Sequence, residues 1–365
     1  MRSFGLWYLE NESNSEMENA QPSFDLHVNF WSLEDYKFDE NIQLPFLDIG
    51  LKIQNYKCIN TVTFFCPFEL KEDDIIDLSS KMTDKNNANI IFNTDCETRT
   101  KDNYTIVEID EEALLIFPLD QEVMNVYSID KGKYGTKLNF SFATFRKYIE
   151  SNEALQQLNT IYVRFRIAGN TLGDNIYFDS EPMNKSFESA FSGTRMIDFK
   201  INEKRNIQEP VRKEIIVKRE KFAKFGRVHF LAMEPSSYEV KAFDNLEMSC
   251  RELEEVLWDD YFGAPIDFSK GHILAYHWKQ KPENGQEKED FSCLIKINYS
   301  KTKSGSIIAY AIIVVALGII SSAISSAIIT GINIFGLCSE IPILASLLSG
   351  IGLLFAGIEL GKRQK

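Results

Sequence analysis

Apolar and polar residues alternate along several short stretches in the first half of the chain. In residues 23–30, phenylalanine, leucine and valine alternate with serine, aspartate, histidine and asparagine. A period of two places the apolar residues on one face of a strand and the polar residues on the other. The same reasoning predicts short strands at residues 60–65, 104–109, 114–117, 123–129 and 161–167. In the last of these, Arg164 and Arg166 fall on the polar face and are weaker candidates for contacting an anion.

Beyond residue 140 the apolar spacing changes more than once. Residues 142–158 have the spacing of an amphipathic helix, and so do residues 246–257. Strands are predicted again at 227–233, 238–243, 272–279 and 291–299. The sequence therefore predicts an α+β fold with a β-rich body and a few helices.

The chain ends in two long apolar runs. From Ser304 to Ser339 there is no charged side chain, and a second run follows Glu340. A bilayer core of roughly 30 Å needs about 20 apolar helical residues. Residues 307–332 and 341–358 supply 26 and 18 residues, so both are long enough to span, the second barely. We expect a C-terminal transmembrane α-helical hairpin after the β-rich body, with a lipid bilayer as its partner.

Flanking charges predict the orientation of this hairpin. Lys296, Lys301 and Lys303 precede the first run, and residues 362–365 after the second include three more basic residues. Lysine and arginine concentrate on the cytoplasmic side of membrane segments. We therefore expect both termini in the cytoplasm and the hairpin in the inner (plasma) membrane. Residues 1–10 show no basic stretch followed by an apolar one, so we expect the body to stay in the cytosol.

Composition divides the chain further. We assign residues 1–199 to a β-rich cytosolic domain, 200–303 to a basic segment with a membrane-proximal α/β region, and 304–365 to the membrane helices and a basic tail. Residues 1–130 hold 9 lysines and arginines against 26 acidic residues, a net charge of −17. Residues 200–227 hold 10 against 4, a net charge of +6. An acidic body with one basic segment suggests an anionic partner.

Cations bind phosphates, and aromatic rings can stack on bases, as in proteins that hold single-stranded nucleic acid. Phe199, Phe222 and Phe225 are interleaved with the basic residues. Two other interpretations remain open: the segment lies against an anionic membrane leaflet, or it pairs with the acidic N-terminal region. The candidate ligand-binding residues are Lys204, Arg205, Arg212, Lys213, Lys218, Arg219, Lys221, Lys224 and Arg227.

Signals for catalysis or metal binding are weak. The sequence contains no Walker A loop, GxGxxG, GxSxG, HExxH or zinc-type spacing. The four histidines are His27, His229, His272 and His277. His272 and His277 lie five apart in a predicted strand and point to opposite faces, so we interpret them as packing or surface residues. The six cysteines form no CxxC pair and are typical of reduced thiols. We therefore predict no enzyme activity, no catalytic residue, no metal site and no cofactor.

The first apolar run carries a stripe of small and polar residues. At about 100° per residue, Gly318, Ser322, Ser325, Ser326 and Asn333 fall on one side of the helix. Small residues allow helices to approach closely, and hydroxyls can hydrogen-bond across them. The stripe is either a packing seam or a pore lining. Two helices cannot enclose a water path, so a pore requires a homo-oligomer.

This layout resembles the two-span membrane effectors of bacterial anti-phage defence, and among them the channel effectors of Hailong-type systems. The resemblance covers the order of the parts and the basic segment, and it transfers no individual residue. It implies a tetramer whose cytosolic part binds an oligodeoxyadenylate made by a partner nucleotidyltransferase. It further implies that the bound oligonucleotide keeps a channel closed and that its loss during infection opens the channel.

The sequence thus predicts a ligand-gated oligomeric membrane effector that forms an ion channel or pore. An anionic nucleotide or oligonucleotide bound to the cytosolic domain would control it, in anti-phage abortive infection. One alternative is a membrane-anchored binding or scaffold protein without pore activity. A second alternative is a membrane-tethered enzyme with an unfamiliar site.

Overall fold

The alternation in residues 23–30 forms strand β2 (Ser23–Trp31), whose apolar residues are buried. The computed structural model describes residues 2–11, 21–33, 36, 44–101, 103–168, 170–180, 192–243, 246–254, 257–262, 271–282, 286–300, 304–332 and 340–363. The chain forms two compact units. Unit 1 comprises Met1–Phe178 and Arg195–Ile297, and unit 2 comprises Asp179–Thr194 and Asn298–Lys365. The predicted α+β class is confirmed, with a β-rich body and a C-terminal apolar helix.

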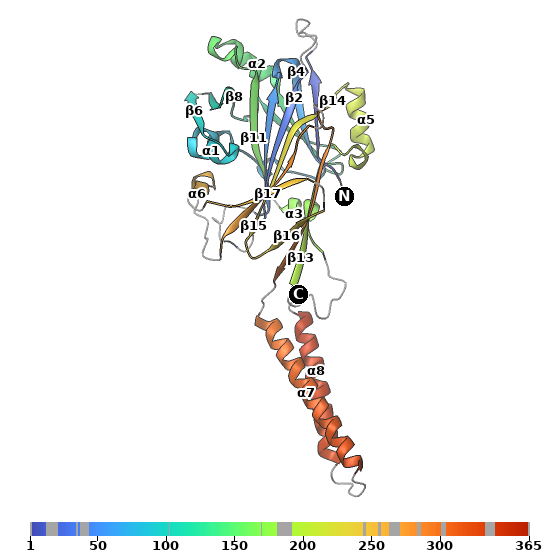
Figure 1. Ribbon diagram of the computed structural model, residues 1–365. Helices are drawn as coiled ribbons and strands as arrows, with labels where there is room; N and C mark the ends of the chain where they lie inside the picture. Colours follow the sequence, from blue (N-terminus) through green and yellow to red (C-terminus); the bar gives the residue numbers. More distant parts are fainter. Residues whose placement is uncertain are drawn as a thin grey trace. The chain divides into compact units, whose positions relative to one another are not determined.

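The largest sheet has ten described strands (Figure 1). Its order is β17-β18-β15-β2-β3-β11-β8-β7-β6, and β5 pairs with β11 beside this path. Neighbours are antiparallel except for the β2–β15 and β8–β11 pairs, which are parallel. The bounds are β3 (Phe46–Gln54), β5 (Ile75–Asp77), β6 (Cys96–Lys101), β7 (Tyr104–Ile109), β8 (Glu112–Ile116), β11 (Thr160–Ala168), β15 (Phe225–Pro235), β17 (Glu247–Glu252) and β18 (Ile273–Gln280).

Two smaller sheets complete the strands. The five-stranded sheet has the order β14-β1-β4-β10-β9, with β1 (Gly5–Glu10), β4 (Ile59–Cys66), β9 (Met124–Ser128), β10 (Thr136–Ser141) and β14 (Lys221–Phe222). The four-stranded sheet has the order β12-β13-β19-β16, with β12 (Tyr177–Ser180), β13 (Ser192–Ile201), β16 (Glu239–Ala242) and β19 (Phe291–Ser300).

Helices are short in the body and long at the C-terminal end of the chain. The α-helices are α1 (Lys85–Phe92), α2 (Phe142–Glu150), α3 (Asn170–Ile176), α5 (Glu209–Val217), α6 (Leu257–Phe262), α7 (Ser304–Ile332) and α8 (Glu340–Arg363). Single turns of 3-10 helix occupy Tyr56–Cys58, Glu72–Asp74, Ser79–Thr83, Glu153–Leu155 and Lys204–Asn206.

The main core lies where the apolar face of the ten-stranded sheet meets the five-stranded sheet. Phe64 of β4 packs edge-on against Phe165 of β11, with ring centroids 5.4 Å apart. Tyr8 of β1 contacts Phe24 of β2 at 5.5 Å. Burying such rings removes a large apolar area from water, and the offset geometry adds to the attraction. The opposite face of the ten-stranded sheet is left for polar residues.

The structure differs from the sequence expectation at residues 246–257. The helix expected over residues 246–257 is wrong, because residues 247–252 form the edge strand β17, paired with β18. Pairing with a neighbouring strand overrides the weak local helical spacing. The expected division between residues 199 and 200 falls inside β13, and the division into domains stays a prediction.

A buried ion pair lies on the polar face of the large sheet. Arg166 donates from Nε and Nη2 to the two carboxylate oxygens of Asp48, at 2.6 and 3.0 Å. Tyr261 of α6 donates its hydroxyl to Asp48 at 2.7 Å and accepts two bonds from Arg164. These contacts join β3, β11 and α6. Arg164 and Arg166, predicted as candidates for an anion, are thus buried among protein partners.

Asp48→Asn keeps the shape of the side chain but leaves two buried guanidinium groups without a carboxylate. We expect the free energy of unfolding to fall by about 3–5 kcal/mol, because an uncompensated buried charge is costly. Denaturant titration of the purified protein measures this. The matched control is Glu108→Gln, which breaks the exposed 3.1 Å pair with Arg99 and should cost less than about 1 kcal/mol. Equal losses in the two variants would contradict the assigned role of Asp48.

In unit 2, α7 and α8 pack as an antiparallel pair along small residues. Ala309, Ala316 and Ala323 of α7 repeat every seventh position and are buried. Gly350 of α8 lies against the carbonyl oxygen of Ala316, and Gly357 lies against that of Ala309. A Cβ at Gly350 or Gly357 would come within 3.3 or 3.1 Å of these backbone oxygens. Glycine therefore permits the close approach of the two helices.

One helix in the described part of the chain is long and apolar enough to cross a membrane. Its qualifying stretch is Ile308–Ser326 in α7. The apolar stretch of α8 that meets the same criterion of composition, Ser346–Glu359, is shorter. By length and composition this helix could span a membrane, and the second span and the cytoplasmic position of both termini stay predictions.

Gly350→Leu and Gly357→Leu should each destabilise the α7–α8 pair by about 1–3 kcal/mol, because the added side chain collides with α7. Gly352→Leu is the matched control, since a Cβ there meets no atom within 4 Å. Thermal unfolding in detergent measures the effect. A loss of stability in Gly352→Leu as large as in the other two variants would argue against this packing.

Candidate ligand-binding pocket

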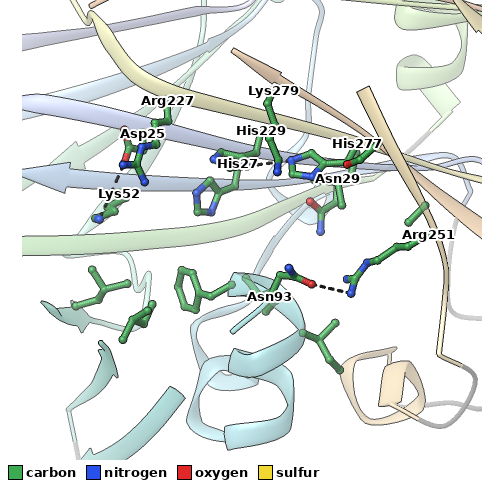
Figure 2. A pocket seen from close by; sticks show the side chains of 18 of the residues that line it. Asp25, His27, Asn29, Lys52, Asn93, Arg227, His229, Arg251, His277 and Lys279 are labelled. Carbon is green, nitrogen blue, oxygen red and sulfur yellow. Dashed lines mark hydrogen bonds and ion pairs between the residues drawn. The ribbon is translucent and has the colours of Figure 1, made fainter. Parts of the chain in front are cut away.

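The polar face of the ten-stranded sheet forms the floor of a pocket of about 660 Å³. Its floor comes from β2, β3, β15 and β18, and its sides come from β17, from α1 with the residue after it, and from the β7–β8 turn (Figure 2). Side chains on adjacent strands at the same register point to the same face. The alternation that buries Phe24, Leu26 and Val28 in the core therefore directs Asp25, His27 and Asn29 toward the pocket. The volume is that of a small-molecule site.

Three histidines from three strands meet on this floor. His27 and His229 are register partners in the parallel β2–β15 pair, with ring centroids 5.2 Å apart. His277 of β18 stacks on His229, and Nδ1 of His229 lies 2.9 Å from Nε2 of His277. One of these nitrogens must donate while the other accepts, so the contact can persist only if at least one ring is neutral.

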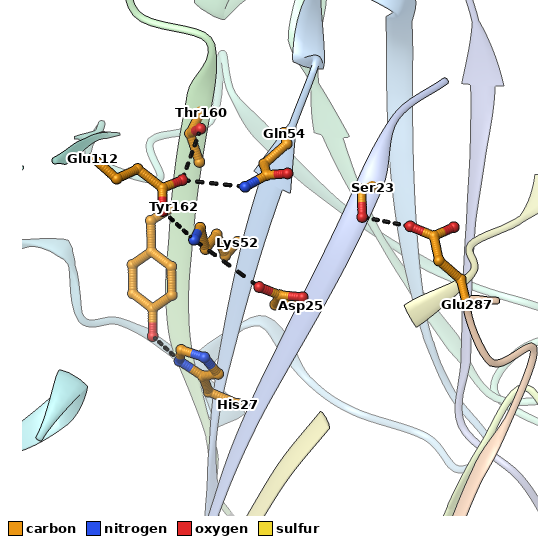
Figure 3. Close-up of polar contacts among 9 residues, drawn as sticks. All are labelled: Ser23, Asp25, His27, Lys52, Gln54, Glu112, Thr160, Tyr162 and Glu287. Atoms are coloured by element: carbon orange, nitrogen blue, oxygen red, sulfur yellow. Dashed lines mark hydrogen bonds and ion pairs between the residues drawn. The ribbon is translucent and has the colours of Figure 1, made fainter. Parts of the chain in front are cut away.

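A chain of hydrogen bonds links His27 to the buried guanidinium of Arg164. Arg164 donates from Nη1 to the Tyr162 hydroxyl at 3.1 Å. That hydroxyl lies 3.4 Å from Nδ1 of His27 (Figure 3). A guanidinium can only donate, so the Tyr162 hydroxyl accepts from Arg164, and the direction of its contact with Nδ1 of His27 depends on the histidine tautomer. Gly50 makes room for this arrangement, because a Cβ there would lie 2.1 Å from the Tyr162 hydroxyl.

Burial and neighbouring cations keep the three histidines neutral. Burial, followed by the charges of Lys279 and Arg227, lowers the pKa of His229 to about 4. Burial, followed by His229 and Lys279, lowers the pKa of His277 to about 3. The pKa of His27 is also well below its usual value, mainly through burial. The three imidazoles on the floor of the pocket are therefore uncharged, and the positive charge near them comes from Arg227 and Lys279.

Carboxylates occupy the other side of the pocket. Lys52 lies 2.5 Å from Glu112 and 4.0 Å from Asp25, and Gln54 also donates to Glu112 (Figure 3). Burial raises the pKa of Asp25, and Lys52 partly offsets this effect. Asp110 and Glu111, in the β7–β8 turn, line the same side and are exposed. The pocket thus has a cationic side and an acidic side.

The candidate residues of the predicted basic segment are, with one exception, outside this pocket. Arg227 alone of its nine candidates lines the pocket. Ile207, Val211 and Ile215 pack around α5 against Trp7 and Phe65, which leaves the basic side chains of the helix in solvent. Arg212, Arg219 and Lys224 are exposed. Five of the others are paired with carboxylates: Lys204 with Glu289, Arg205 with Glu203, Lys213 with Glu209, Lys218 with Glu214, and Lys221 with Glu10.

The Lys221–Glu10 pair, with a distance of 2.5 Å, agrees with the interpretation that the basic segment neutralises the acidic N-terminal region. Most of the other carboxylate partners lie inside the segment itself. Exposed pairs of this kind contribute little to stability and can exchange partners. A role of the segment in ligand binding stays a prediction.

The polar stripe of α7 lies on the side of the helix that faces away from α8. At about 100° per residue, Ala309, Ala316 and Ala323 fall roughly 140–180° from Gly318 around the helix. Gly318, Ser322, Ser325 and Ser326 are exposed, and a Cβ at Gly318 would meet no atom within 4 Å. Asn333 lies outside the described residues. The stripe is therefore not the seam between α7 and α8.

The sequence did not reveal the histidine cluster. His27, His229 and His277 are far apart along the chain, and their association follows from strand order. His272, by contrast, contacts Glu252 at the surface. The one available signal was the placement of His27 on the polar face of a half-buried strand. Within the described residues, no group of three or more histidine, cysteine or acidic side chains has the geometry of a metal site.

Comparison with known proteins gives no family assignment. No protein-family model matches this chain, and no curated protein matches its sequence.

The lowered pKa values predict that acid destabilises the protein. In the unfolded chain a histidine titrates near 6.5, whereas folded His229 titrates at about 4. Between these values the unfolded state binds more protons, so the free energy of unfolding falls as the pH falls. From pH 7 to pH 5 this should cost about 2 kcal/mol for His229.

Denaturant titrations at pH 7 and pH 5 measure this cost. His229→Gln should show a smaller loss on acidification than the unsubstituted protein. His272→Gln is the control, because this exposed histidine lies outside the pocket, and it should show the full loss. An unchanged pH dependence in His229→Gln would rule out the buried, neutral state of this ring.

Proposed function

We propose that this protein is a ligand-gated membrane effector. In this proposal the C-terminal helices of several copies assemble into an ion channel or pore in the inner membrane. The β-rich unit lies in the cytoplasm with both termini and binds an anionic nucleotide or oligonucleotide that controls the pore. The observation that carries the proposal is the polar stripe on the side of α7 that faces away from α8.

The stripe supports oligomerisation because of the cost of polar groups in hydrocarbon. Ser322 and Ser325 are exposed on a helix that is apolar enough to cross a membrane. Serine can satisfy its hydroxyl within its own helix, but a row of small residues also allows another helix to approach. Since α8 occupies the opposite side, the stripe is available to other copies. Several α7 helices facing inward would place these hydroxyls along a water path.

The distribution of charge supports an anionic regulator. The basic segment reverses the sign of an otherwise acidic body, and a separate pocket in unit 1 is lined by Arg227, Arg251 and Lys279. The resemblance to two-span defence effectors agrees with this arrangement. By that analogy we propose a tetramer, a nucleotidyltransferase that makes the regulator, and a role in abortive infection.

A flux assay tests the pore directly. The purified protein is reconstituted in liposomes, and ion flux is followed with and without candidate anionic regulators. Ser322→Cys should render the flux sensitive to a charged thiol reagent added to the water, because its thiol would line the pore. Ile324→Cys is the matched control, since Ile324 is equally exposed but lies on neither the stripe nor the seam.

The protein with its native cysteines, treated with the same reagent, provides the baseline for this assay. Absence of flux under every ligand condition would refute the pore and favour the alternative of a membrane-anchored binding or scaffold protein. In that case, replacing α7 and α8 with an unrelated hairpin should leave the binding or scaffold function of the protein intact. Equal block of both cysteine variants would mean that the stripe does not line the pore.

A further inference from the structure

We propose that the pocket over the ten-stranded sheet binds a sugar phosphate, either as a free molecule or as part of a nucleotide. The cationic side formed by Arg227, Lys279 and the histidines would hold the phosphate. The acidic side at the β7–β8 turn would hold the sugar hydroxyls. This inference deepens the proposed function, on which it rests, by assigning the regulator's site to the pocket and not to the basic segment.

On the cationic side, Lys279 carries the positive charge that has no acidic partner among the described residues. Lys279 forms no ion pair with any residue in the described part of the chain, and Arg227 lies beside the half-buried Asp25. Arg251 is bound to Asn93 at 2.7 Å and to Glu254 at 3.5 Å, so it is already oriented along the rim (Figure 2). Arg227 of β15 and Lys279 of β18 are near neighbours on adjacent strands and can meet one phosphate from two directions, whereas Arg251 lies toward the other end of β18, opposite Ala275.

A buried charge beneath the floor adds to this field. Arg164 and Arg166 are both buried, and the described residues give them a single carboxylate partner, Asp48. Within the described residues, two guanidinium charges thus share one carboxylate. Arg164 is connected to the pocket by hydrogen bonds: it donates to the Tyr162 hydroxyl, which in turn contacts His27. An unscreened charge in a partly desolvated site acts over a longer distance than it does in water.

The neutral histidines suit a phosphate better than they suit a metal. Nδ1 of His27 is occupied by the Tyr162 hydroxyl, so its Nε2 is left for a ligand. His229 and His277 hold each other at 2.9 Å, a contact that a metal ion would have to break. Neutral imidazoles in an electropositive site can donate to an anion without first taking up a proton.

The acidic side determines which phosphate compound fits. Glu112 is already bound by Lys52, Gln54 and Thr160. Asp110 and Glu111 are exposed at the turn and face the same cavity. Carboxylates repel a second phosphate, but they accept hydrogen bonds from vicinal sugar hydroxyls, as in dinucleotide sites. A volume of about 660 Å³ accommodates a pentose phosphate and leaves room beside Phe92 for a base.

Calorimetric titration of the purified full-length protein in detergent tests this assignment. The probes are ribose 5-phosphate, adenosine monophosphate and inorganic phosphate at matched ionic strength. We expect ribose 5-phosphate to bind one site per chain. Tighter binding of adenosine monophosphate would assign the sugar phosphate to a nucleotide, and equal or weaker binding would assign it to a free sugar phosphate.

Paired variants locate the site. Replacing Arg227 and Lys279 together by alanine should weaken binding about tenfold or more, because two charge-assisted hydrogen bonds are lost. Replacing Arg212 and Arg219 by alanine removes the same charge from the basic segment outside the pocket, and binding should be unchanged. Glu111→Gln, on an exposed turn, should weaken ribose 5-phosphate but leave inorganic phosphate unaffected.

Two outcomes would overturn the inference: no binding of any probe, or loss of binding in the Arg212 and Arg219 variant with retention in the Arg227 and Lys279 variant. If the latter variant does not fold, Ser249→Trp fills the pocket from the exposed strand β17 and should block binding by itself. Binding is measured without a membrane current. A protein that binds but passes no ions refutes only the pore, and one that passes ions but binds no probe refutes only this assignment.

Discussion

Each strand of the ten-stranded sheet has to fit two environments at once, because successive side chains point to opposite faces. One face is buried against the five-stranded sheet by rings such as Phe24, Phe64 and Phe165. The other face then receives every intervening residue, including His27 and Arg164. A shift of one residue in any of these strands would exchange the two sets. The core and the pocket therefore depend on the same register.

On the polar face of the sheet, the deepest polar groups have the most protein partners and those at the pocket have the fewest. Deepest, Asp48 and Arg166 form a bidentate pair that Tyr261 completes. Tyr162 crosses over Gly50 to connect this layer with His27. The outermost groups line a cavity large enough for a ligand. Such a gradient from fully paired to partly paired charges is a feature of binding sites, where an incoming ligand supplies the missing partners.

The same separation of faces holds in α7, where small residues occur on two sides of one apolar helix. Ala316 meets Gly350 of α8, whereas Ser322 on the other side is exposed. The second unit thus has one row of small residues that α8 covers and an open row that is exposed. The proposed pore depends on the open row, since a single pair of helices would have no lumen.

The sequence by itself determined the features that depend on local periodicity: the strands β2, β4, β7 and β11, the apolar α7, and the two faces that Arg164 and Ile161 occupy. Local order could not determine which strands pair. The association of His27 with His229 and His277 arises because β15 inserts between β2 and β18, a choice made by long-range packing. The strand at residues 247–252 was missed for the same reason. Only the tertiary structure decided the location of the pocket and the side of α7 that α8 covers, because both depend on contacts between segments distant in sequence.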